Sequence, residues 1–164
     1  MTPLTDWIDA TVSRMIDRPP EHVYAVLTDY RVGHPAILPR SFFSDLIVEQ
    51  GGIGAGTVLR CSIRVFRREF PFRQRVSEPE PGRVLLETDV DTGQLTRWTL
   101  EPHARGQHTL VILYSAFPPL PGIMGLLDRL SKPAIIRSIY TRELQQLHDY
   151  LHSMRPDQTH QIQP

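Results

Sequence analysis

The chain has 164 residues, enough for one domain with a single hydrophobic core, and its 18 Lys and Arg residues balance 18 Asp and Glu residues. A net charge of zero excludes a general attraction to nucleic acid or anionic lipid, while leaving room for local charged patches. The one cysteine, Cys61, cannot form an intramolecular disulfide, no secretory signal opens the chain, and no apolar run reaches the ~20 residues of a membrane helix. We therefore expect a cytoplasmic protein without a transmembrane segment or a nucleic-acid partner.

The first segments predict a strand followed by a short helix. Residues 10–16 alternate between apolar and polar side chains, as a half-buried strand does. Two prolines followed by Glu21 mark the start of a helix, which we expect to end at Asp29 or Tyr30. The segment 33–43 contains glycine and prolines that break regular structure, but its apolar residues indicate that it folds back over the core.

A glycine-rich stretch, Gly51–Gly56, raises the question of phosphate binding. A phosphate-binding loop of this kind needs a strand before it and a helix that begins at its end. A short strand over 46–49 precedes the stretch, but residues 57–66 alternate in the manner of a second strand. No helix N-terminus is available to receive a phosphate, so we expect a flexible hairpin turn.

Four more strands are predicted at 70–78, 83–90, 93–101 and 107–117, and turn-forming residues at hairpin spacing connect them. The simplest topology is an antiparallel meander. In the first of these strands, alternation places the amide of Gln74 on the same face as three apolar side chains, Phe70, Phe72 and Val76. The last strand is apolar on both faces around 110–114, so the pattern does not show which face points inward. One face is compatible with a contact in a homodimer.

A long amphipathic helix is predicted at 123–152. Apolar residues recur every three to four positions and form one stripe that should face the sheet, with polar residues such as Glu143 elsewhere on the helix. Pro133 should kink or split the helix, which would leave 123–130 as a separable lid. Residues 155–164 are polar and aperiodic and are predicted to be disordered.

Together these segments carry a family resemblance. The residues concerned are the Pro-Pro-Glu-His-Val-Tyr-Ala-Val-Leu-Thr-Asp-Tyr stretch (Pro19–Tyr30), the glycine-rich turn before Thr57, the strand end Trp98–Pro102, and the proline-rich entry to the last helix. Over residues 9–154, a single domain, the chain resembles the START-like, Bet v 1-like (SRPBCC) superfamily, which includes polyketide cyclase/dehydrase and lipid-transport proteins. The resemblance implies an α+β helix-grip fold: a curved antiparallel sheet of six to seven strands around a long C-terminal helix, with two short helices after the first strand. It also implies a cavity between sheet and helix.

Same-face positions of successive strands, together with the helix stripe and nearby loops, give the candidate ligand-binding residues. Gln74 is the strongest polar candidate, because a buried amide among apolar side chains needs a hydrogen-bonding partner. His34 could act as a general base or bind a ligand carbonyl, although a histidine between Gly33 and Pro35 is more often a turn residue. The predicted set is His34, Leu59, Ile63, Phe70, Phe72, Gln74, Trp98, Val111, Tyr114 and Leu130.

Other kinds of site find little support. His148 and His152 lie four residues apart on the last helix, but no cysteine or carboxylate pattern completes a metal site, and we expect neither metal nor cofactor. The leading hypothesis is a protein that binds a hydrophobic small molecule, such as a lipid or a polyketide-like or sterol-like compound. The alternative is an enzyme of the polyketide cyclase/dehydratase type that uses the same cavity. A third class, a module that dimerises through its sheet, follows from the two-sided apolar strand.

Overall fold

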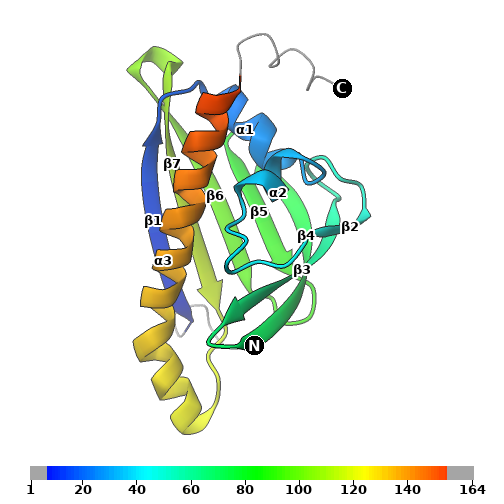
Figure 1. The fold of residues 1–164 in the computed structure, drawn as a ribbon, viewed down its shortest axis with the longest axis vertical. Coiled ribbons are helices and arrows are strands. Elements are labelled where there is room, and N and C mark those ends of the chain that lie inside the picture. Colours follow the sequence, from blue (N-terminus) through cyan, green and yellow to red (C-terminus); the bar gives the residue numbers. More distant parts are fainter. Residues whose placement is uncertain (1–6, 155–164) are drawn as a thin grey trace.

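The computed structural model of the chain describes residues 7–154, with the backbone alone for Met124. The predicted tail at 155–164 lies outside the described residues. Within them, one curved sheet and one long helix enclose the core, with two short helices between the first two strands (Figure 1). The predicted α+β helix-grip fold is confirmed.

In the described part of the chain, seven antiparallel strands form a single sheet. They are β1 (Ile8–Ile16), β2 (Ile47–Gln50), β3 (Val58–Val65), β4 (Arg68–Glu80), β5 (Val84–Asp89), β6 (Leu95–His103) and β7 (His108–Phe117). Their order in the sheet is β1-β7-β6-β5-β4-β3-β2. Strands β2 to β7 therefore form the predicted meander, because short turns join each strand to its neighbour, and β1 is added beside β7.

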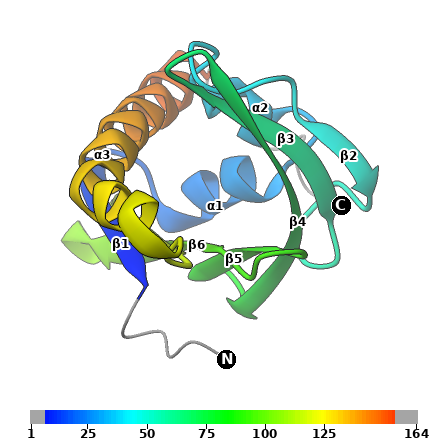
Figure 2. The same cartoon turned by 90° about the horizontal axis from the view of Figure 1, so that it is seen from below.

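The α-helices occupy the concave side of this sheet (Figure 1 and Figure 2). The first two, α1 (Pro20–Thr28) and α2 (Gly33–Ile37), follow β1, and a three-residue 3-10 helix, η2 (Ala104–Gly106), joins β6 to β7. The last helix, α3 (Gly122–Ser153), runs along one side of the curve (Figure 2). Seen from below, the sheet curls around the space that contains α1. This arrangement directs the inner side chains of several strands toward the helices.

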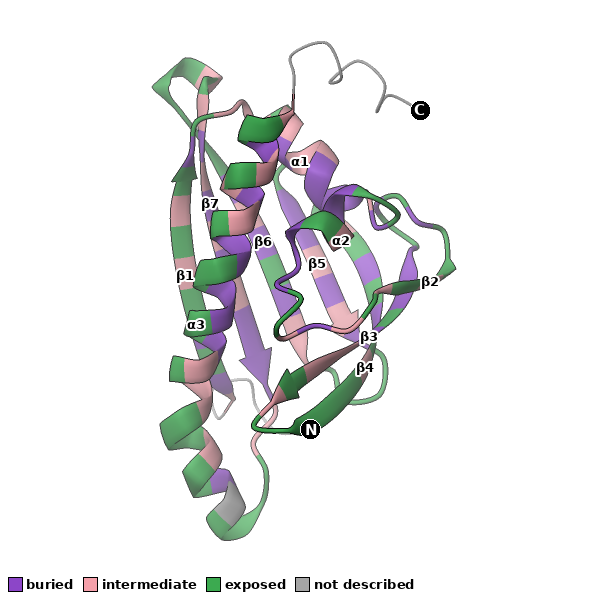
Figure 3. Ribbon diagram, viewed as in Figure 1, coloured by how far each residue is buried: buried purple, intermediate pink, exposed green. Residues whose placement is uncertain are grey.

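The two halves of α3 differ in what they cover. In the second half, apolar side chains at three- and four-residue spacing are buried against the sheet, namely Ile136, Ile139, Tyr140, Leu144, Leu147 and Leu151. In the first half, Ile123, Leu126, Leu127 and Leu130 are exposed (Figure 3). The predicted single stripe facing the sheet is therefore correct only for the second half. The expected split at Pro133 is wrong, since α3 runs unbroken through this residue.

The glycine-rich stretch is a turn that joins β2 to β3, as predicted. Its backbone is bonded to the end of α1: the Tyr30 amide donates to the Gly52 carbonyl at 2.9 Å, and the Gly54 amide donates to the Thr28 carbonyl at 2.9 Å. Gly52 adopts a φ of 128°, which residues with side chains rarely adopt. Gly52 and Gly54 therefore allow the backbone of the turn to lie against the end of α1.

The faces of β7 are resolved by burial. Val111, Leu113 and Ser115 are buried on the inner face, whereas Leu110, Ile112 and Tyr114 alternate with them and are only partly buried. The face of β7 that contains Val111 and Leu113 therefore points toward the core. Among the described residues, no helix has the length and apolar character required to cross a membrane.

Candidate functional site

A pocket lies between the sheet, the segment that follows α1, and the second half of α3. Its walls come from α2, the loop after it, β3, β4, the β5–β6 hairpin and α3, so residues distant in sequence meet there. The lining residues are His34, Leu38, Phe43, Leu46, Leu59, Cys61, Ile63, Phe72, Gln74, Glu87, Gln94, Thr96, Tyr140 and Glu143. Apolar and hydrogen-bonding side chains contribute equally to this set, which suits a ligand of mixed character.

The structure brings together half of the residues predicted for the site. His34, Leu59, Ile63, Phe72 and Gln74 line the pocket. Trp98 and Val111 are fully buried in the core on the inner face of the sheet but do not line it. Their contact with a ligand stays a prediction.

The predicted placement is wrong for Phe70, Tyr114 and Leu130, which do not line the pocket. Phe70 is 53% exposed because it lies near the tip of the β3–β4 hairpin, where the strands extend beyond the core. Leu130 is 74% exposed because it belongs to the first half of α3. Tyr114 points to the outer face of β7, opposite to its buried neighbours Leu113 and Ser115.

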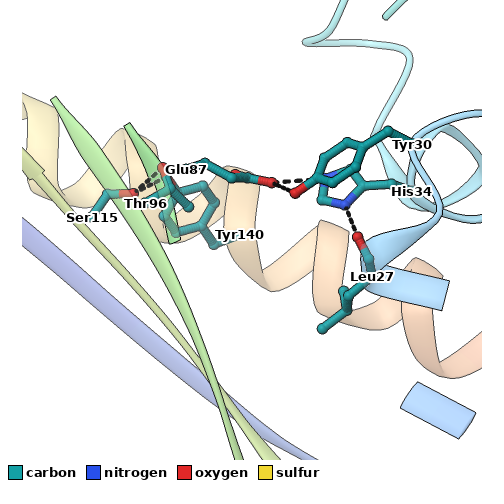
Figure 4. Close-up of polar contacts among 7 residues, drawn as sticks. All are labelled: Leu27, Tyr30, His34, Glu87, Thr96, Ser115 and Tyr140. Carbon is teal, nitrogen blue, oxygen red and sulfur yellow. Dashed lines mark hydrogen bonds and ion pairs between the residues drawn. The ribbon is translucent and has the colours of Figure 1, made fainter. Parts of the chain in front are cut away.

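One buried polar group joins α1 and α2 to the sheet. The Tyr30 hydroxyl donates a hydrogen bond of 2.6 Å to Glu87 Oε1, and Nε2 of His34 lies 3.6 Å from the same oxygen (Figure 4). Burial, and then the negative charge of Glu87, raise the pKa of Tyr30 well above its usual value, so its phenol keeps the proton that it donates.

The imidazole of His34 is held on three sides. Its Nδ1 lies 2.7 Å from the Leu27 carbonyl, and since a carbonyl only accepts, Nδ1 carries a proton and Nε2 faces Glu87. The ring stacks on Tyr30, with 4.6 Å between centroids, and meets the Trp98 rings edge-on at 5.8 Å. His34 is thus a fixed, buried residue of helix α2 and not the loop residue that the sequence predicted.

A second buried polar group lies on the other side of Glu87 and connects the sheet to α3. Thr96 Oγ1 and Ser115 Oγ are 2.8 Å apart, and Ser115 Oγ is in turn hydrogen-bonded to the hydroxyl of Tyr140 (Figure 4). Burial is the main cause that raises the pKa of Tyr140, so this hydroxyl is also protonated. Glu87 and Thr96 are direct partners in the β5–β6 register, which places the two groups next to each other.

Two further polar side chains line the pocket without a protein partner. Among the described residues, no hydrogen bond or ion pair engages the side chain of Gln74 or the carboxyl of Glu143, and both are buried. Burial, and then the charge of Glu87, raise the pKa of Glu143 well above the usual value for a glutamate. Glu143 therefore favours its protonated form, in which it can donate a hydrogen bond or a proton.

Sequence reasoning missed both carboxyls, although the signals for them differ. Glu87 occupies an inner-face position of β5 between Leu85 and Asp89, the same kind of signal that identified Gln74 in β4. Glu143 lies three residues after Tyr140 and four before Leu147, at helical spacing on the buried stripe of α3. The prediction that placed it elsewhere on the helix is wrong, because a polar residue was taken to mark a solvent-facing position.

The pocket is small in this conformation. The space open to the centres of water molecules is about 40 Å³. A single water needs roughly 10–15 Å³ by this measure, so the pocket has room for about three waters. Among the described residues, no group of three or more His, Cys, Asp or Glu side chains is placed to hold a metal ion.

Comparison with known proteins supports the architecture and its family. A family model described as polyketide cyclase / dehydrase and lipid transport matches residues 8–152. A search of curated proteins found no match to the chain.

Three of the solved structures with a similar fold illustrate its range. The KanY protein is 25% identical, covering 90% of this chain and 99% of its own, with a TM-score of 0.77. The Zhui aromatase/cyclase from Streptomyces sp. R1128 is 17% identical, covering 89% and 94%, with a TM-score of 0.71. A START superfamily protein from Mycobacterium smegmatis is 14% identical, covering 90% and 99%, with a TM-score of 0.65.

Proposed function

Because the chain belongs to the polyketide cyclase / dehydrase and lipid transport family, we propose that its pocket binds a small molecule with an apolar, ring-containing body and several keto or hydroxyl groups. The apolar walls formed by Leu38, Leu46, Leu59 and Phe72 would contact the body of the ligand. The polar residues on the opposite walls would orient its oxygen atoms.

The observation that carries this proposal is the unpaired state of Gln74 and Glu143. Among the described residues, their polar atoms do not belong to the fully buried side-chain atoms that lack a hydrogen bond, so they border the open space of the pocket, where a ligand or water can complete their hydrogen bonds. A plain hydrocarbon chain offers no such partner. An oxygenated ring compound offers acceptors for the protonated Glu143 and for the amide of Gln74, so it fits this site better than a lipid tail or a sterol skeleton does.

Binding requires the pocket to widen, because the free space of about 40 Å³ holds only a few waters. Leu38 and Phe43 come from the loop after α2. Near Phe43 this loop is hydrogen-bonded to β3, by the Arg64 amide to the Phe42 carbonyl at 2.6 Å and by the Ser44 amide to the Ser62 carbonyl at 3.0 Å. We therefore expect the side chains of this wall, rather than its backbone, to move when a ligand enters.

Calorimetric titration with emodin, a hydroxylated anthraquinone, tests the proposal, with palmitate and naphthalene as comparison ligands. Emodin should bind most tightly. Gln74→Leu keeps the shape of the side chain but loses one or two hydrogen bonds, so it should weaken emodin binding about three- to tenfold and leave naphthalene unchanged. Native mass spectrometry of the protein purified from its own host would identify the natural ligand. Tighter binding of palmitate than of emodin, or equal loss of emodin and naphthalene in Gln74→Leu, would contradict the proposal.

A second candidate function is acid–base catalysis on the same ligand, in the manner of a cyclase or dehydratase. The observation that favours it is the contrast between Glu143, which favours its protonated form, and Glu87, which is held by Tyr30 and faces His34. Such a pair can donate a proton at one point and accept one at another. Incubation with a linear poly-β-ketone thioester should then yield a cyclised, dehydrated product. Glu143→Gln should retain ligand binding but lose this product.

A further inference from the structure

The first half of α3 and the turn before it carry an apolar stripe that faces solvent. Its helical members, Ile123, Leu126, Leu127 and Leu130, recur at three- and four-residue spacing, which places them on one side of the helix, and Leu120 lies just before it. Their exposed fractions are 50% for Leu120, 80% for Ile123, 60% for Leu126, 53% for Leu127 and 74% for Leu130. Single exposed apolar residues are ordinary, but a continuous stripe of this kind marks a contact surface.

The tip of the β3–β4 hairpin presents a second apolar group. Phe66 is 84% exposed and Phe70 is 53% exposed. The turn residues Phe66 and Arg67 have φ angles of 49° and 63°, a left-handed conformation that residues other than glycine adopt only at a cost. Phe66 therefore lies in the turn itself, between the end of β3 and the start of β4.

These two surfaces lie at the same end of the molecule. Figure 1 shows the start of α3 and the tip of the β3–β4 hairpin at its lower end, and the view from below in Figure 2 shows both facing the reader. In Figure 3 both are coloured as exposed, whereas the second half of α3 is largely buried on its inner side. Both apolar groups therefore lie toward the same end of the molecule, with the start of α3 extending furthest (Figure 1).

Basic residues accompany both apolar groups. The hairpin carries Arg64, Arg67 and Arg68 against one acid, Glu69, and no acidic partner of Arg67 or Arg68 is found among the described residues. The segment 120–137 carries Arg129, Lys132 and Arg137 against one acid, Asp128, which pairs with Lys132 at 2.5 Å. The hairpin and this segment therefore each carry two more cations than acids, although the whole chain is neutral.

We propose that this end docks on an anionic lipid surface, with the exposed Leu, Ile and Phe side chains inserted among the lipids and the arginines at the headgroups. Apolar residues flanked by cations are the features that hold amphipathic segments at the interface of a bilayer. A second copy of the chain fits less well. In a two-fold contact the same surface faces itself, so the arginines of one copy would oppose those of the other.

Vesicle flotation tests the proposal on the full chain, with phosphatidylcholine vesicles and with vesicles of phosphatidylcholine and phosphatidylglycerol in equal parts. The wild type should float with the anionic vesicles, and less so as salt is raised. The double variant Ile123→Glu/Leu127→Glu should partition about tenfold or more weakly into both kinds of vesicle. The double variant Arg67→Gln/Arg68→Gln should lose about tenfold on the anionic vesicles alone.

Matched controls come from the rest of the surface. Ile53→Glu changes an apolar residue that is 61% exposed in the turn after β2. Arg83→Gln/Arg105→Gln removes two exposed arginines, one in the β4–β5 turn and one in η2, at the opposite end of the sheet. Both controls should float like the wild type, and all variants should bind emodin as the wild type does if the pocket is intact. The proposal is overturned if the wild type fails to float, if the controls lose as much as the test variants, or if sedimentation shows a dimer that Ile123→Glu/Leu127→Glu dissociates while flotation stays unchanged.

Discussion

The dependence of stability on pH provides a direct test of the buried carboxyl of Glu143. Its pKa in the folded protein is raised well above the usual value, mainly by burial and secondly by the charge of Glu87. In the unfolded chain a glutamate titrates near its ordinary value of about 4.3. Between these two values the folded state holds one more proton than the unfolded state. The contribution of Glu143 to stability is therefore fully present below about pH 4.3 and is lost as the pH rises toward the folded-state pKa.

The size of this effect follows from linkage. Within that window the folded state holds one more proton than the unfolded state. Each rise of one pH unit therefore lowers the free energy of unfolding by about 1.4 kcal/mol. Glu143→Gln has no such proton to lose. Its free energy of unfolding, measured relative to that of the wild type, should therefore rise by about 1.4 kcal/mol for each pH unit within the window. The side chains are nearly equal in shape, so a new cavity does not confuse the comparison.

Urea unfolding at a series of pH values measures this difference. The fluorescence of Trp98, which is 1% exposed, should report the transition. Glu101→Gln, at an exposed position of β6, is the matched control and should follow the wild-type curve. Glu87→Gln removes the charge that helps to raise the pKa of Glu143, so the pH range in which stability falls should become narrower. Parallel curves for the wild type and Glu143→Gln between pH 4.3 and 7 would refute the assignment of a raised pKa to Glu143.

Three further predictions concern access and placement. Amides at 125–130 should exchange hydrogen faster than those at 144–151, because only the second half of α3 is packed against the sheet. If the first half acts as a lid, exchange at 125–130 should slow when a ligand binds. Equal protection of both halves without ligand would exclude a lid. Cys61 lines the pocket, and burial raises the pKa of its thiol, so iodoacetamide should label it slowly in the native protein and rapidly in urea. Emodin should slow the labelling of the native protein further. A labelling rate that emodin does not change would place the ligand elsewhere. Phe72→Ala should weaken emodin binding severalfold, while Phe70→Ala should leave both emodin binding and the melting temperature near those of the wild type. A larger loss of emodin binding in Phe70→Ala than in Phe72→Ala would show that Phe70 lines the site, as the sequence predicted.

The sheet was predictable because alternation and turn chemistry are local properties. Strands β3 to β7 begin and end within a few residues of the predicted bounds. Glycine, proline or aspartate marks the connections from β4 to β7, whereas the β3–β4 turn is formed by Phe66 and Arg67. Helix α2 has only five residues, too few for helical periodicity to appear, so its residues predicted a loop and His34 a turn. The second short helix was expected from the family resemblance alone.

The site was less predictable because burial depends on what covers a residue. Periodicity identified an apolar stripe along α3 but could not show that the sheet ends before its first half, which left Leu130 in solvent. The same reasoning that found Gln74 would have found Glu87, had charged residues on inner strand positions been treated as candidates. The meeting of Glu87 with Tyr30 joins residues 57 positions apart, and no local pattern predicts such a pair.

The pocket draws its walls from residues as far apart as His34 and Glu143, so it is complete only when the last helix has docked on the sheet. A ligand of this pocket therefore recognises the finished fold and has no partial site to occupy in an unfolded or half-folded chain. Its binding energy should appear in full as resistance to unfolding, about 2.7 kcal/mol at a free concentration one hundred times the dissociation constant. A melting-temperature screen of small molecules would accordingly find ligands for this protein without an assay for what it does to them.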